Sequence, residues 1–201
     1  MKVTVLLNEL AAAACCASTD EIHIVLNGVF VECVVGKPVL IGTDRRVLVA
    51  VTSEVVQSAD YAAAAFILPT ALVADLCEIG RRSGIKQVEL EPGYGARGPR
   101  VVCTVTDGES SVCVTNQTID GKFPNWREAM AAPAADTDKT TRVAFNFGLL
   151  TKLAKAAAKL NGNPINQQSP RMRFKDELSA IKVSFDKLNN LKAALMPIKL
   201  S

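Results

Sequence analysis

The cysteines are the residues whose number and spacing could indicate a metal site or a redox site. Six are present: Cys15, Cys16, Cys33, Cys77, Cys103 and Cys113. A structural zinc site needs paired ligands at close spacing, usually with histidines, but the chain has no Cys-x-x-Cys pair and a single histidine, His23. We therefore expect free thiols that pack as small apolar groups, with adjacent Cys15 and Cys16 as the one candidate redox pair. The sequence predicts no metal and no cofactor.

Acid, base and nucleophile patterns are equally weak. The carboxylates fall in separate predicted turns: Asp44 in one, Asp107 with Glu109 in a second, and Asp176 with Glu177 in a third. No shared acid and base geometry is indicated. The serines lack a partner base, because His23 lies in a predicted strand and no Gly-x-Ser-x-Gly motif occurs. The sequence thus favours a non-catalytic protein over an independent α/β enzyme.

Hydrophobic periodicity predicts a strand, a helix and then several strands, three times over. In the first unit we expect a strand at 2–7, a helix capped by Asn8 and ending near Ser18, and strands at 22–33, 38–43 and 47–52. In the second we expect a strand at 65–68, a helix capped by Thr70 and stopped by Gly84, and strands at 87–91, 101–106 and 111–118. The glycine-rich residues 92–99 read as a hairpin loop, since a Gly-x-Gly-x-x-Gly motif is absent.

The third unit is predicted after an alanine- and aspartate-rich linker at 132–139. It opens with a strand at 142–145, continues with a helix capped by Asn146 and ending near Leu160, and closes with strands at 171–175, 179–185 and 193–200. Apolar residues at the very end of the chain would fray unless they were docked. We therefore expect the C-terminal segment to be held against a neighbouring surface.

Composition sets the outer limits. With 201 residues, 49% hydrophobic and 21% charged, the chain can bury a substantial core. A net charge of +3 does not by itself indicate a nucleic-acid-binding protein. The first residues show no signal-peptide pattern, and the alanine-rich stretch 11–17 is too short to span a bilayer. We expect a cytoplasmic protein that does not enter a membrane.

Four segments, in order, resemble the bacterial DNA polymerase sliding clamps, the β-type processivity factors. They are LNGVFVE at 26–32, GTDRRVLV at 42–49, FPNWR at 123–127 and MPIKL at 196–200. Residues 1–131 resemble a complete middle domain of that family, and 140–201 resemble the second half of its last domain. The resemblance implies an α+β DNA-clamp fold, with repeated β-α-β-β-β units and helices on one face of antiparallel sheets.

The resemblance also implies a function. Proteins of this family are rings that tether a DNA polymerase to duplex DNA without reading its sequence, and they bind polymerase and clamp loader through linear peptide motifs. A homo-oligomer and a non-catalytic accessory role are expected on that basis. The alternative is a clamp-like module that does not encircle DNA and binds partner peptides as a competitor or recruiter.

The resemblance implies two sets of site residues. The peptide-binding groove would use Leu26, Thr43, Leu48, Pro124, Ala129, Ala194, Met196 and Pro197. Some of these residues could instead simply fill the core. Within this region, residues 45–47 replace the family's Gly-His-Arg, so the loop beside the groove is bulkier and more basic.

The DNA-facing surface would be lined by helices with one apolar and one basic side. In the third predicted helix, Lys152, Lys155 and Lys159 gather opposite the leucines. Arg81 and Arg82 lie at the end of the second, where the helix dipole alone would also favour them. An ordinary solvated face is the simpler reading of these cations. The first helix contains no basic residue, in contrast to this expectation.

Overall fold

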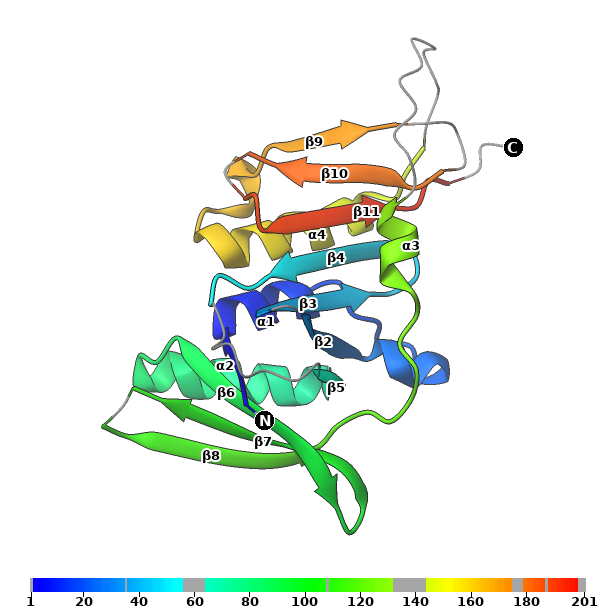
Figure 1. Ribbon diagram of the computed structural model, residues 1–201. Coiled ribbons are helices and arrows are strands. Elements are labelled where there is room, and N and C mark those ends of the chain that lie inside the picture. The colour runs from blue at the N-terminus through cyan, green and yellow to red at the C-terminus, as the bar shows by residue number, and fades with distance from the viewer. Residues whose placement is uncertain are drawn as a thin grey trace.

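Two antiparallel sheets backed by helices make up the computed structural model, which describes residues 2–34, 36–55, 64–107, 109–131, 144–174, 179–186 and 188–198 (Figure 1). The α+β class expected from the sequence is confirmed.

The smaller sheet has four strands in the order β1-β6-β7-β8. These are β1 (Val3–Leu6), β6 (Gln87–Gly95), β7 (Gly98–Thr106) and β8 (Ser111–Gln117). The N-terminal strand pairs with β6, with Val3 opposite Leu90. The predicted hairpin between β6 and β7 is present, and the two strands extend farther into the glycine-rich segment than expected.

The larger sheet has seven strands in the order β5-β2-β3-β4-β11-β10-β9. They are β5 (Ala64–Pro69), β2 (Gly28–Val34), β3 (Lys37–Thr43), β4 (Val47–Thr52), β11 (Leu191–Leu195), β10 (Ile181–Phe185) and β9 (Pro170–Arg173). The β4–β11 pair joins residues 47–52 to residues 191–195, with Leu48 opposite Ala194. The C-terminal part thus extends a sheet begun by the N-terminal part.

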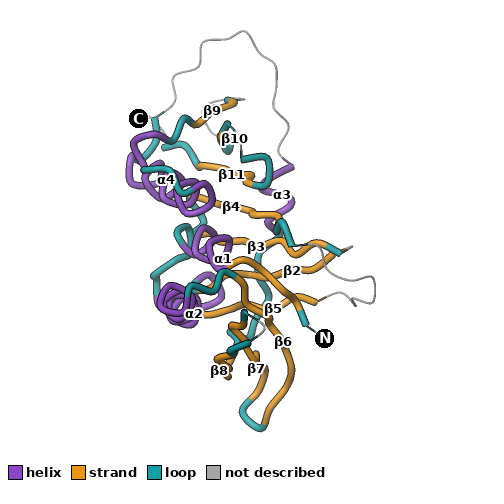
Figure 2. The backbone as a smooth tube through the Cα atoms, turned by 90° about the vertical axis from the view of Figure 1, so that its left-hand side faces the viewer, coloured by secondary structure: helices purple, strands orange, loops and turns teal. Residues whose placement is uncertain are grey.

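Three helices cover one side of the sheets. They are α1 (Leu7–Ala14), α2 (Thr70–Ser83) and α4 (Phe147–Asn161), and Figure 2 shows them stacked side by side with α1 between the other two. The short helix α3 (Trp126–Ala131) lies on the opposite side of the larger sheet. Two 3-10 segments, η1 (Glu21–Leu26) and η2 (Ile165–Gln167), complete the described elements.

The main core lies between the helices and the sheets. Leu10, Leu72 and Leu153 bring one buried side chain from each of the three helices. The approach of α1 to β3 is close: a Cβ on Gly42 would lie 1.9 Å from the backbone oxygen of Ala13. A glycine is therefore required for this packing. A second, smaller core lies on the other face of the larger sheet and includes Leu26, Ile41, Leu48 and Phe123.

Helix starts differ from the sequence prediction. α1 begins at Leu7 rather than after Asn8, because the buried Glu9 carboxylate accepts from the Leu6 amide at 3.1 Å and takes the capping role. α2 begins at Thr70, and Pro69 occupies the N-cap position. The Asn146 cap is confirmed, as its side chain accepts from the Gly148 amide at 2.7 Å. Gly84 and Gly162 end α2 and α4 in the left-handed conformation that glycine adopts without strain.

Two predicted strands are also corrected. Residues 22–26 belong to η1, so the strand prediction for His23 is wrong; Asp20 caps this segment, and Ile22 and Ile24 are exposed at 82% and 61%. The last strand ends at Leu195 instead of residue 200, although Ile198 still donates its amide to the Ala144 oxygen at 2.7 Å. The predicted linker at 132–139 and the start of the strand predicted at 142–145 lie outside the described residues.

Candidate functional site

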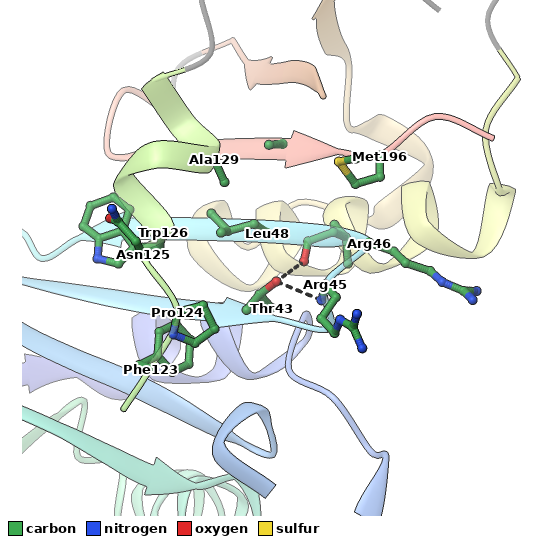
Figure 3. Close-up of a pocket in the computed structure, with 12 residues that line it drawn as sticks. Thr43, Arg45, Arg46, Leu48, Phe123, Pro124, Asn125, Trp126, Ala129 and Met196 are labelled. Atoms are coloured by element: carbon green, nitrogen blue, oxygen red, sulfur yellow. Dashed lines mark hydrogen bonds between the residues drawn. The ribbon is translucent and has the colours of Figure 1, made fainter. Parts of the chain in front are cut away.

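An apolar pocket of about 150 Å³ opens on the face of the larger sheet that carries α3 (Figure 3). Three segments that are distant in sequence form it. They are the β3–β4 turn with its flanking residues 43–48, the segment 123–129 that leads into α3, and the end of β11 with Met196. The pairing of β4 with β11 brings the first and last of these segments together.

The β3–β4 turn is fixed by side-chain hydrogen bonds to the backbone. The buried Thr43 hydroxyl donates to the Val47 oxygen at 2.8 Å and accepts from the Arg45 amide at 3.1 Å. Asp44 accepts from the amides of Arg46 and Val47 at 3.0 and 2.9 Å. Arg45 has a φ of 76°, which an L side chain rarely adopts. The turn therefore stores strain at the edge of the pocket.

The 123–129 segment is anchored to β2. Phe123 stacks on Phe30 with ring centroids 4.7 Å apart, and its side chain is buried in the smaller core. The Trp126 indole donates to Glu32 at 3.0 Å, and the Arg127 guanidinium makes an ion pair with the same carboxylate at 2.9 Å. Two contacts of different chemistry thus hold the start of α3 in place over the sheet.

The wall of the pocket that contains Met196 is held in place by a backbone hydrogen bond. Met196 donates its amide to the Arg46 oxygen at 2.7 Å, which ties the residue after β11 to the β3–β4 turn. The Met196 side chain is 42% exposed, although it is large and apolar. An unbranched thioether at the mouth of a pocket can adapt to ligands of different shape.

The structure places six of the eight predicted groove residues in the wall of this pocket: Thr43, Leu48, Pro124, Ala129, Ala194 and Met196. Leu26 is 3% exposed and packs in the smaller core, and Pro197 is next to the pocket in sequence but does not line it. The remaining wall residues were not among the eight: Arg45, Arg46, Val47, Phe123, Asn125 and Trp126. Their position inside the two motifs at 42–49 and 123–127 is the signal that could have found them.

Most of the five predicted DNA-facing cations are engaged by carboxylates. Arg81 and Arg82 both pair with Glu78 at 2.7 Å, and these contacts lower the pKa of Glu78 to about 2, with the Arg81 hydrogen bond as the largest cause. Lys152 of α4 makes an ion pair with Asp44 of the β3–β4 turn. Lys155 and Lys159 are exposed and make no ion pair within the described residues.

The helical face carries a wide depression between α1, α2 and α4. It has a volume of about 860 Å³, and its lining includes Ala11 of α1 together with the cations Arg81, Lys86 and Lys159. The small side chain of Ala11 in α1 leaves this space open. The cations in its lining come from α2, from α4 and from the segment between α2 and β6, because α1 itself has no basic residue.

Three of the described thiols, those of Cys15, Cys16 and Cys103, do not have the properties of nucleophiles. Burial raises the pKa of Cys103 to about 12 and raises the pKa of Cys16 well above its usual range. Burial also raises the pKa of Cys15, although Lys159 and Lys155 oppose the shift. These thiols stay protonated at neutral pH, and a thiol is a poor nucleophile in that form.

No group of three or more histidine, cysteine or carboxylate residues that could hold a metal ion occurs within the described ranges. In the same part of the chain, no helix is both long and apolar enough to cross a membrane.

Comparison with known proteins relates this chain to others through its fold. No family model matches the sequence, and no curated protein matches it either. Solved structures do match. A DNA polymerase sliding clamp from Pseudomonas aeruginosa with ligand aligns with a TM-score of 0.70 at 14% identity, over 100% of this chain and 66% of that one.

Two further structures agree. The sliding clamp (DNA polymerase III subunit beta) of Bartonella birtlesii bound to griselimycin aligns with a TM-score of 0.65 at 16% identity, over 99% of this chain and 66% of that one. The DNA polymerase III beta subunit of Thermotoga maritima aligns with a TM-score of 0.65 at 13% identity, over 100% and 65%. The chain spans about two thirds of the length of these structures. It therefore has the fold of the bacterial DNA polymerase sliding clamps.

Proposed function

We propose that this protein is a clamp-like processivity factor that binds linear peptide motifs of partner proteins and tethers a DNA polymerase to duplex DNA. The observation that supports the proposal best is the pocket of Figure 3. Each of its three walls carries a segment that resembles the sliding clamps in sequence: 42–49, 123–127 and 196–200. A non-catalytic role and a cytoplasmic location are part of the same proposal.

The pocket has the chemistry of a peptide-binding site. A cavity of about 150 Å³ accepts a group about the size of benzene, so one aliphatic or aromatic side chain of a partner can enter it. Leu48, Ala194 and Met196 supply apolar walls. Asn125 and the two arginines of the β3–β4 turn supply polar groups at the rim. Apolar anchors with a polar rim are typical of short-motif recognition.

The helical face is the proposed DNA-facing surface. Lys155 and Lys159 project from α4 without an ion-pair partner in the described structure, and Lys86 and Lys159 line the depression beside α1. Lysines that contact phosphates bind DNA without sequence preference, because phosphates carry no base information. We propose a homo-oligomer that surrounds the duplex with this face.

The ion pairs of the same face favour the alternative, a clamp-like module that does not encircle DNA. Arg81 and Arg82 share Glu78, Lys152 is paired with Asp44, and α1 offers no cation. Less positive charge is therefore free for phosphates than the number of cations suggests. In this alternative the protein binds partner peptides as a competitor or recruiter.

A primer-extension assay distinguishes the processivity factor from the module that does not encircle DNA. The replicative DNA polymerase of the same organism would be supplied with a linear primed template, onto which a ring can thread from a free end. The proposal predicts longer products when the protein is added, and loss of the effect when both template ends are blocked with streptavidin. A Lys155→Glu, Lys159→Glu variant should lengthen products less. Unchanged product length, together with a monomeric mass by light scattering, would support the alternative instead.

A further inference from the structure

A second groove lies on the other side of α3 from the pocket. It has a volume of about 620 Å³ and runs between α3 and strands β10 and β11. Trp126, Met130 and Ala131 of α3 give it apolar lining, and Arg173, Lys182 and Lys192 bring three cations to it. Trp126 lines both this groove and the pocket, so the two hollows are adjacent.

Arg173, Lys182 and Lys192 make no ion pair within the described residues, whereas Arg127 of the same groove is paired with Glu32. The described lining contains no carboxylate; Glu128, the acidic residue of α3, lines neither hollow. A ligand with negative charges would therefore meet three cations that have no carboxylate partner in the described part of the chain.

Strand register places these cations on the same face as the pocket. Ala194, which lines the pocket, lies directly opposite Lys182, and Lys182 lies directly opposite Arg173. Directly opposed residues of antiparallel strands point to the same side. Neighbouring strands are about 4.8 Å apart, so the Cα atoms of Lys182 and Arg173 lie about 5 and 10 Å from that of Ala194. Lys192, two residues before Ala194 in β11, shares this face.

We propose that this basic groove, Arg173, Lys182 and Lys192, binds an acidic stretch of the same partner peptide whose apolar residue enters the pocket. The inference rests on the proposed peptide-binding function. An extended peptide advances about 3.3 Å per residue, so acidic residues two to three positions from the apolar anchor reach Lys182 and Arg173. The apolar lining favours a peptide over a nucleic acid, because it offers contacts to aliphatic parts of side chains between the charges.

The test uses fluorescence anisotropy with the full chain and labelled clamp-binding motif peptides of a bacterial polymerase. Three consecutive aspartates are placed on the N-terminal side of the motif in one peptide and on the C-terminal side in another. Matched peptides carry asparagines instead. One of the two aspartate peptides should bind about tenfold more tightly than its asparagine partner at low salt, and the gain should shrink as salt is raised.

Variants of the three cations test whether the gain in affinity from the aspartates comes from the basic groove. An Arg173→Gln, Lys182→Gln, Lys192→Gln variant should lose the aspartate gain and keep its affinity for the asparagine peptides. A control variant, Lys37→Gln, Arg97→Gln, Arg100→Gln, removes the same charge from exposed positions elsewhere and should keep the gain.

Each remaining outcome counts against a defined part of the argument. Equal binding of aspartate and asparagine peptides to the unchanged protein would overturn the basic groove and leave the pocket intact. Failure of the asparagine peptides to bind at all would overturn the proposed peptide-binding function. A labelled oligothymidylate that binds these three cations more tightly than the aspartate peptide would assign the groove to nucleic acid and refute the inference.

Discussion

Arg45 offers a prediction whose magnitude follows from one backbone angle. Its φ of 76° lies in the left-handed region, which costs an L residue about 1–2 kcal/mol. Glycine escapes this cost but loses about 0.5–1 kcal/mol more backbone freedom on folding than alanine. The difference leaves Arg45→Gly more stable than Arg45→Ala by about 1 kcal/mol. For a chain of this length that corresponds to a difference of about 2–4 °C in Tm.

The comparison between glycine and alanine isolates the backbone. Both variants remove the contact between the Arg45 guanidinium and His23, 2.6 Å apart, so its loss cancels. Arg46 supplies the internal control, because its φ is not positive. There, Arg46→Gly should be less stable than Arg46→Ala by about 0.5–1 kcal/mol.

Urea unfolding followed by circular dichroism measures all four variants under one set of conditions. The predicted pattern is a reversal of sign between the neighbouring positions, with glycine preferred at 45 and alanine preferred at 46. If Arg45→Ala were as stable as Arg45→Gly, Arg45 would not have the left-handed conformation assigned to it, and the turn at the edge of the pocket would not be strained.

The other predictions concern packing and charge. Gly42→Ala should destabilise the fold by about 3 kcal/mol or more, because its Cβ would meet the backbone of Ala13, whereas Gly93→Ala, which meets nothing within 4 Å, should be nearly neutral in urea unfolding. Glu32→Ala should destabilise the fold by about 1–3 kcal/mol and weaken peptide binding, because it removes the acceptor of the Trp126 indole and the ion-pair partner of Arg127. Glu32→Gln should retain more stability and more peptide affinity than Glu32→Ala. Equal losses in the two variants would contradict this explanation. Glu78→Gln should lower Tm at neutral pH. Because the pKa of about 2 in the folded state lies below the ordinary glutamate pKa of 4.5, the difference in Tm from the unchanged protein should shrink from about pH 4.5 downward and vanish near pH 2. A difference that stays constant from pH 7 to pH 2 would argue against the Arg81 and Arg82 contacts.

Local signals in the sequence predicted the helix ends and one helix cap, whereas the caps predicted at Asn8 and Thr70 were wrong. Gly84 and Gly162 end their helices because few other residues adopt the left-handed conformation without strain, and Asn146 caps α4 through its own side chain. The ion pairs of Arg81 and Arg82 with Glu78 were not predicted, although the spacing of three and four residues in a helix favours them. Such features depend on neighbours a few residues away.

Features that depend on residues distant in sequence were either not predicted or were predicted only through the resemblance to the sliding clamps. Apolar residues at 22 and 24 suggested a strand, yet they are exposed, because η1 turns them away from the core. The Lys152–Asp44 ion pair joins residues 108 apart in sequence, and the Trp126–Glu32 hydrogen bond joins residues 94 apart. The hydrophobic periodicity of a sequence does not predict such contacts. The pairing of β4 with β11, on which the pocket depends, is of the same kind.

The central claim is that the pocket of Figure 3 binds a peptide motif, and one titration tests it most directly. The labelled clamp-binding motif peptide would be titrated with the unchanged protein, with Met196→Asp in the pocket wall, and with Tyr94→Asp at an exposed apolar position of the β6–β7 hairpin. We predict saturable binding to the unchanged protein and to Tyr94→Asp, and a loss of tenfold or more in affinity for Met196→Asp. Equal affinity for all three proteins would contradict the claim.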